Sequence, residues 1–325
     1  MNATTLIGVL ASPVLAVTLP IEAALAVGIQ ALNVPAQGSS PPLSGAVWYP
    51  CATAPSPTVV GPFVVSVTKD CAIDGTKLPL IVVSHGRTGS FMGHRDAAQA
   101  LADAGFVVAA ISHPGDNAQD RSRTDELSVF VERPADIRRL VDYLLDSWNH
   151  ASVIDPNRIG VFGFSRGGYT GLVIVGADPY FRRDLRMCAG KTGPLCEEVH
   201  QGKLAPLAHD ARIKAAVIAD PLSVFFTNES FGDVRVPIQL WRSERGGDGV
   251  TPVSVALVAE NLPVKPEFHT VVNARHFAFL PPCQAPVAAP MSDLCSDPQG
   301  FDRAEFHRQF NASAVEFFLH ALRRD

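Results

Sequence analysis

The chain has 325 residues, of which 47% are hydrophobic and 18% are charged, and its formal net charge is −5. This composition supplies a sizeable core and argues against a disordered protein. The sequence contains no cluster of basic residues, so a nucleic-acid partner is not expected. The length fits one large domain or two ordinary ones.

The first 26 residues are apolar and contain neither Lys nor Arg. A hydrophobic run covers residues 6–19, and Pro20 interrupts it. Ala24-Leu25-Ala26 then has small residues at its first and third positions. This pattern predicts a secretory signal peptide that is cleaved after Ala26. A hairpin or helix buried in the mature fold is the alternative. A stable membrane span is not expected, because the run is short and carries prolines.

The six cysteines fall into pairs that are close in sequence. Short loops between polar, proline-rich segments favour local disulfides over the other connectivities that six cysteines allow. The predicted pairs are Cys51 with Cys71, Cys188 with Cys196, and Cys283 with Cys295. No C-x-x-C or clustered Cys/His spacing supports a metal site, so no metal and no cofactor are predicted. Disulfides imply an oxidising compartment, and we therefore expect a secreted or periplasmic protein.

Strand-like runs and amphipathic helices alternate along the first half of the chain. Two short strands are expected within 27–49 and another at 59–67, as an antiparallel edge. A continuous apolar strand at 78–84 ends in the glycine-bearing loop that begins with His85-Gly86-Arg87. A helix at 94–104, a strand at 106–111 and a helix at 133–148 are predicted to follow.

The segment Gly163-Phe164-Ser165-Arg166-Gly167 joins a short apolar strand to a helix that begins at Arg166. It resembles the nucleophile elbow of α/β-hydrolases. In such a turn, a side chain at either flanking glycine would collide with the neighbouring strand or helix. The turn lifts the serine hydroxyl above the sheet and directs the first N–H groups of the helix towards an oxyanion.

The second half of the chain continues the alternation after an interruption. Residues 178–211 are polar and lack periodicity, and we interpret them as an insertion that is either a lid or cleft wall, or a surface excursion. Strands are then predicted at 213–219, 236–241 and 267–272, with a helix at 253–260 between the last two. The pattern Asp302-Arg303-Ala304-Glu305 predicts a capping box that opens a final helix.

This order of elements predicts a mostly parallel sheet with helices on both faces. Ligands in such sheets bind where the strands end. Ser165, Asp220, Asp248, His276 and the loop after His85 all follow predicted strands. Their convergence on one edge is the strongest functional signal in the sequence.

A serine hydroxyl needs a base, and histidine usually provides it. His276 is the histidine that lies at a late strand end, after the candidate acids, which gives the order Ser, Asp, His. The acid itself stays open: Asp220 follows the strand after the elbow, and Asp248 follows the next strand. Glu244 is a less favoured third candidate.

A tetrahedral intermediate would also need two hydrogen-bond donors for its oxyanion. The backbone N–H of Arg166, directly after the serine, is one candidate. The backbone N–H of Arg87, in the loop after the first parallel strand, is the other. Only the backbone acts at both positions, and removal of one such donor typically costs about 10²–10³ in kcat.

Three stretches together resemble plasma-type platelet-activating-factor acetylhydrolases and the bacterial dienelactone-hydrolase-like proteins related to them. They are residues 81–86 with Ser84-His85-Gly86, residues 101–110, and residues 163–168. The resemblance runs from about Val27 to the end of the chain. It implies an α/β-hydrolase fold, a Ser-Asp-His triad and metal-free hydrolysis of carboxylic esters. By position it implies Ser165, Asp220 and His276, with Arg87 at the loop donor.

The sequence therefore predicts residues 27–325 to be a single α/β-hydrolase domain with an insertion at about 178–211. The expected activity is hydrolysis of a small-molecule or lipid-like ester through an acyl-enzyme. Three alternatives stay open: an amide or peptide hydrolase, a cutinase-like polyester hydrolase, and a catalytically silent binding protein on the same scaffold.

Overall fold

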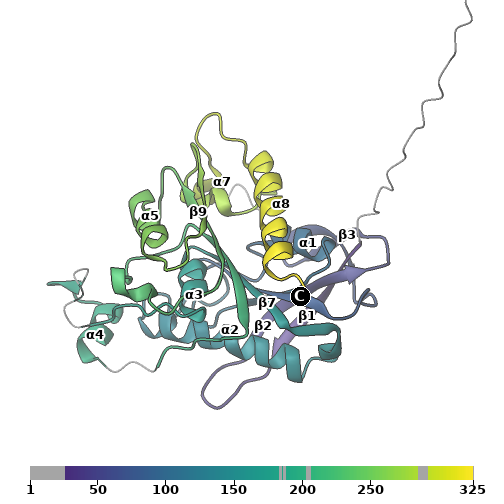
Figure 1. Cartoon of the computed structure of the whole chain (residues 1–325), viewed down its shortest axis with the longest axis horizontal. Coiled ribbons are helices and arrows are strands. Elements are labelled where there is room, and N and C mark those ends of the chain that lie inside the picture. Colours follow the sequence, from purple (N-terminus) through teal and green to yellow (C-terminus); the bar gives the residue numbers. More distant parts are fainter. Residues whose placement is uncertain (1–25, 183–184, 186–187, 203–205, 285–291, 325) are drawn as a thin grey trace, which may run out of the picture.

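A computed structural model describes residues 26–182, 185, 188–202, 206–284 and 292–324 of the chain (Figure 1). Its centre is a ten-stranded sheet with the order β10-β9-β8-β7-β5-β6-β2-β1-β4-β3. The strands are β1 (Ala26–Val34), β2 (Leu43–Cys51), β3 (Ser56–Val60), β4 (Phe63–Lys69), β5 (Leu78–Ser84), β6 (Val107–Ser112), β7 (Ile154–Phe164), β8 (Ile213–Ala219), β9 (Ile238–Ser243) and β10 (Glu267–Val271).

The helices cover both faces of this sheet. They are α1 (Arg95–Asp103), α2 (Ser128–Asp146), α3 (Arg166–Ile174), α4 (Pro194–Gln201), α5 (Pro252–Asn261), α7 (Ser292–Cys295) and α8 (Arg303–Ala321), with short 3₁₀ turns that include η4 (His276–Phe279). None of the helices in the described part of the chain combines the length and the apolar content that a membrane span requires.

Six neighbouring strands, from β10 to β6, pair in parallel. Strand β2 then pairs antiparallel with β6, and β1 pairs antiparallel with β2. The predicted mostly parallel sheet with an antiparallel edge is therefore confirmed. Because β5, β7 and β8 all end at the same edge, the loops after them are brought together.

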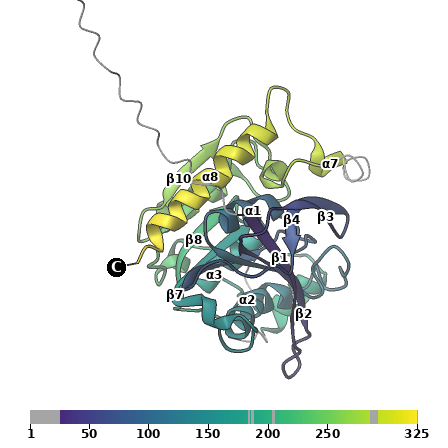
Figure 2. The ribbon, with the colours of Figure 1, turned by 90° about the vertical axis from the view of Figure 1, so that its right-hand side faces the viewer.

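Successive residues of the central strands point to opposite faces, so each face has its own core. On one face, Leu80 and Val82 pack with α2, α3 and α5. On the other face, Ile81 and Val83 pack with α1 and α8, whose side-by-side arrangement is visible in Figure 2. The continuous apolar run of β5 reflects this burial on both sides.

Most of the buried residues described in the insertion belong to a cluster of their own, while Ala208 packs into the core beside the sheet. Helix α4 joins a separate aromatic and aliphatic cluster with Phe130, Tyr169 and Phe225. The disulfide between Cys188 and Cys196 lies in this cluster. The other two disulfides also have the predicted local pairing, Cys51 with Cys71 and Cys283 with Cys295.

Three local predictions need correction. The strand expected at 59–67 is a hairpin, since Gly61 has a φ of 56° and makes the turn between β3 and β4. Helix α2 begins at Ser128 and contains Pro134, so it is one turn longer than its apolar spacing indicated. Asp302 caps α8 through Glu305 N, but the Glu305 side chain turns to Arg308 and Gln309 instead of completing a capping box.

The predicted signal peptide lies outside the described residues except for its last position. Ala26 is the first residue of β1 and pairs with Cys51.

Candidate active site

Ser165 occupies a sharp turn between β7 and α3. Its backbone has φ 57° and ψ −118°, a conformation that side-chain-bearing residues seldom adopt. Its N–H donates to Ala219 O at 3.0 Å, and its carbonyl accepts from Leu222 N at 2.9 Å. These two bonds fix the turn to the end of β8, so the hydroxyl is presented at the sheet edge.

The glycines around Ser165 are required by close packing. A Cβ at Gly163 would collide with the carbonyl of Gly167, and a Cβ at Gly167 would collide with the carbonyl of Ser84 in β5. The start of α3 therefore packs directly against β5, as the sequence motif indicated.

We expect Gly167→Ala to lower the free energy of unfolding by about 1–3 kcal/mol or more, because the new methyl group must push two backbone segments apart. The measurement is the urea concentration at the midpoint of unfolding, compared between variants whose m-values are equal. Gly232→Ala is the matched control, since a Cβ there would meet only Glu229 O, at 3.6 Å. Equal midpoints for the two variants would contradict this account of the elbow.

His276 lies between Ser165 and Asp220. Its Nε2 is 2.9 Å from Ser165 Oγ, and its Nδ1 is 2.7 Å from Asp220 Oδ2. Asp220 and His276 are buried, with 0% and 1% of their surfaces exposed. A carboxylate can only accept, so Nδ1 carries the hydrogen and Nε2 of the neutral ring accepts from the serine hydroxyl.

The carboxylate of Asp220 is itself held in place. Ser243 donates to it twice, from its N–H to Oδ1 at 2.9 Å and from its hydroxyl to Oδ2 at 2.7 Å. The backbone N–H of His276 donates to Gly246 O at 2.9 Å, and its ring stacks on Phe164 with centroids 4.7 Å apart. Both partners of the contact are therefore oriented before any substrate binds.

The other two candidate acids lie elsewhere. Asp248 is exposed at a tight turn, with a φ of 47°, and it lies on the rim of the pocket described below. Glu244 accepts from the backbone N–H of Asn273 at 2.7 Å. Of the three, Asp220 is the carboxylate within hydrogen-bond distance of His276.

The loop after β5 passes directly beside Ser165. A Cβ at Gly86 would lie 3.3 Å from Ser165 Cβ, so the backbone of the loop approaches as closely as a glycine allows. Arg87 directs its side chain outward to Asp125, at 3.0 Å. Arg166 is the first residue of α3, and its N–H therefore has no acceptor within the helix.

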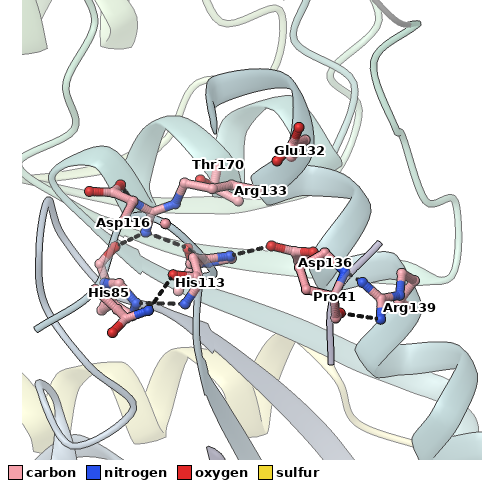
Figure 3. A network of polar contacts seen from close by, with 12 residues as sticks. Pro41, His85, His113, Asp116, Glu132, Arg133, Asp136, Arg139 and Thr170 are labelled. Atoms are coloured by element: carbon pink, nitrogen blue, oxygen red, sulfur yellow. Dashed lines mark hydrogen bonds and ion pairs between the residues drawn. The ribbon is translucent and has the colours of Figure 1, made fainter. Parts of the chain in front are cut away.

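A buried network of charged and polar groups holds this loop from below (Figure 3). Arg133 of α2 donates to the carbonyl of His85 and to Asp116 Oδ2, the latter at 2.7 Å. Asp116 Oδ1 accepts from the N–H of Thr88 at 3.2 Å, and Oδ2 also accepts from Arg166 at 2.9 Å. The network thus fixes the backbone on both sides of Arg87, at His85 and at Thr88.

The two histidines of this network are neutral. His85 Nδ1 lies 2.6 Å from Gly86 O and must donate, while its Nε2 accepts from His113 N at 3.1 Å. Burial, together with the nearby Arg133 cation, lowers the pKa of His85 to about 3. Burial also holds the pKa of His113 well below its usual value.

The charges of the network stabilise one another. Burial opposes ionisation of Asp116, but the guanidinium groups of Arg133 and Arg166 outweigh it and lower the pKa of this carboxyl. Burial lowers the pKa of Arg133 to about 10, although Asp116 offsets part of the effect. Arg133 thus remains a cation at neutral pH. Asp136, which contacts His113, has a pKa raised by burial to about 7.

A pocket of about 490 Å³ opens beside Ser165. Its walls come from the β3–β4 turn, the loop from His85 to Arg95, and the segment after η4. None of the described residues of the insertion lines it. The interpretation of that insertion as a surface excursion fits this geometry better than a cleft wall. No group of three or more His, Cys, Asp or Glu side chains among the described residues is arranged to hold a metal ion.

A solved structure has a similar architecture. The chain is similar to a ferulic acid esterase from Streptomyces cinnamoneus, with a TM-score of 0.67, 20% identity, and coverage of 93% of this chain and 92% of that one. The chain has the α/β-hydrolase fold.

A family model matches part of the chain. Residues 92–183 of the chain match the model of the prolyl oligopeptidase family, and this stretch contains Ser165 and its turn. A search of curated proteins gives no match.

The sequence did not reveal the buried network around Arg133. Arg133 stands in an amphipathic helix, where a charged residue ordinarily faces solvent. Asp116 and His113 offered a weak signal, since both follow strand β6 at the edge where the site lies. The contacts of Asp116 with Arg133 and of His113 with Asp136 depend on how α2 packs, and the sequence pattern does not contain that information.

Proposed function

We propose that this α/β-hydrolase is a serine hydrolase that cleaves carboxylic esters through an acyl-enzyme. The observation that carries the proposal is the unbroken series of contacts from Ser165 Oγ through the His276 ring to Asp220. The fold shared with an esterase and the partial match to a peptidase family support a hydrolase of esters or peptides.

In the first half of the reaction, Ser165 Oγ attacks the ester carbonyl carbon while His276 Nε2 takes the hydroxyl proton. The oxyanion accepts hydrogen bonds from the backbone N–H groups of Arg87 and Arg166. Collapse of the intermediate breaks the carbon–oxygen bond of the ester, and His276 returns the proton to the departing alcohol. Asp220 holds the imidazole tautomer and stabilises the imidazolium.

In the second half, water attacks the acyl-enzyme. His276 Nε2 removes a proton from the water, and the same two N–H groups stabilise the second oxyanion. The acid product leaves when the bond to Ser165 Oγ breaks and the proton returns to that oxygen. The side chains already described carry out each proton transfer.

The three disulfides support a place in an oxidising compartment, and we propose that the protein is secreted or periplasmic. A signal peptide at 1–26, with residues 27–325 as one catalytic domain, belongs to the same proposal. The structure contains the three disulfides, whereas the signal peptide is proposed from the sequence pattern alone.

We expect a fluorophosphonate probe to label the wild-type protein on the peptide that contains Ser165, and to leave Ser165→Ala unlabelled. Mass spectrometry of the digested adduct identifies the site. The reason is that the probe requires a serine activated by a base and an oxyanion site. Absence of labelling in the folded wild type would favour a silent binding protein.

Matched 4-nitrophenyl esters and 4-nitroanilides of the same acids separate the two substrate classes. The proposal expects faster cleavage of the esters. Cleavage of an anilide by a protein that leaves the corresponding ester intact would instead favour the peptidase alternative, for which the partial family match is the supporting observation. Soluble products released from a polyester film would favour the cutinase-like alternative.

A further inference from the structure

The pocket beside Ser165 is lined by apolar side chains that belong to the edge of the core. Phe63, Phe91, Phe277 and Leu280 are only partly buried, and each packs against the cluster between the sheet and helices α1 and α8. All four also line the pocket. The core therefore opens into the active site at this point and leaves an apolar surface for a ligand.

One wall of the pocket comes from the tip of the β3–β4 hairpin. The guanidinium carbon of Arg95 lies 4.1 Å from the centroid of the Phe63 ring, and Arg95 Nη2 donates to Pro282 O at 3.3 Å. Arg95 is buried. One cation thus fixes the aromatic ring and also ties the hairpin to the segment after η4.

A second contact closes the same wall. The side-chain amide of Gln284 accepts from Val64 N at 3.0 Å and donates to Val64 O at 2.7 Å. The adjacent Cys283 is bonded to Cys295. Three segments that are far apart in sequence therefore hold Phe63 in a fixed position.

The charged groups around the pocket leave its interior suited to an uncharged ligand. Arg87 is paired with Asp125 and Arg95 is engaged by the Phe63 ring. Burial lowers the pKa of His94, another lining residue, to about 4, so this ring is neutral. Asp248 and Arg121 are exposed and carry opposite charges.

We propose that this pocket binds a bulky, uncharged apolar group of the ester, of the size of an aryl ring or a six-carbon chain, and that Phe63 determines this preference. The inference rests on the proposed esterase function and adds its substrate class. The pocket volume of about 490 Å³ lies within the range for sites that enclose small-molecule ligands. An acetyl group would leave most of it unfilled.

The test compares three esters by pH-stat titration: methyl acetate, methyl hexanoate and hexyl acetate. For the wild type we expect kcat/KM for at least one larger ester to exceed that of methyl acetate by roughly 250-fold to 1,000-fold, since each buried methylene contributes about four-fold and the larger esters carry four or five more of them. Which of the two is favoured shows whether the acyl or the alcohol side enters the pocket. Equal values for all three esters would overturn the inference.

Two variants link the preference to the wall. Phe63→Ala should reduce kcat/KM for the favoured ester by about 10-fold, mainly through KM, and reduce it less for methyl acetate, so that the ratio between the two esters falls. Arg95→Leu should act in the same direction because it releases the ring. Val64→Ala is the control, since this side chain is 51% exposed and does not line the pocket. An unchanged preference in both wall variants would show that Phe63 does not set it.

The two proposals fail in distinguishable ways. A protein that cleaves methyl acetate and shows no gain with size retains the ester function and loses the pocket assignment. A protein that cleaves none of the three esters loses the ester function itself, and the pocket assignment with it.

Discussion

Asp220→Asn is expected to lower kcat by about 10⁴-fold, whereas Asp248→Asn should stay within a few-fold of the wild type. The amide of an asparagine can present its NH₂ group to His276 Nδ1, which then favours the wrong ring tautomer. Nε2 would carry the hydrogen and could no longer accept the proton of Ser165. Asp248 is an exposed turn residue, so its amide changes little at the reacting atoms.

The measurement is kcat for a 4-nitrophenyl ester, with circular dichroism to show that both variants are folded. Asp248→Asn is the matched control because it makes the same chemical change in a strand-end loop of the same active site. A large loss in Asp248→Asn with near-normal activity in Asp220→Asn would assign the acid to Asp248. In that case the Asp220 contact would be a structural one.

Arg133→Met should lower kcat by about 10²–10³-fold with a smaller change in KM. Arg133 donates to the carbonyl of His85 and binds Asp116, which in turn holds the N–H of Thr88. Loss of both contacts lets the loop move, so the Arg87 N–H between them, which we propose as an oxyanion donor, would be displaced. Arg133 does not contact the reacting atoms and would act as a positioning residue.

Loss of stability must be separated from loss of positioning in this variant. Breaking a buried ion pair commonly costs about 3–5 kcal/mol, although Arg166 stays beside Asp116 and limits the loss. Rates should therefore be measured well below the unfolding midpoint, together with the affinity for a boronic acid that mimics the tetrahedral intermediate. Arg138→Met, on the exposed face of the same helix, is the control. Weakened substrate binding with unchanged kcat would argue against a positioning role.

The sequence predicted the parts of the fold that depend on local patterns. Continuous apolar runs, such as Leu78–Ser84, predicted strands buried on both faces, because period and composition report burial directly. The elbow was predictable because two glycines around a serine encode a steric requirement of the turn itself. The position of His276 after the last strand was enough to make it the favoured base.

Other features depend on packing that no local pattern encodes. The choice between Asp220 and Asp248 stayed open since both follow strands at the same edge, and a hydrogen-bond distance depends on loop geometry. No local pattern indicates that Phe63 lines a pocket, because an apolar residue in a strand is ordinarily a core residue. It reaches the site through a hairpin, and the strand-like pattern of residues 59–67 does not reveal the turn at Gly61.

The short spans of the disulfides bear on the order in which the molecule can assemble. The linked cysteines are 20, 8 and 12 residues apart, so each pair can meet by closing a small loop. The parallel sheet depends instead on strands that are distant in sequence, and such topologies form slowly. We therefore expect the correct pairs to be able to oxidise as the chain emerges into its compartment. The slow step of folding would then begin with the thiols already consumed.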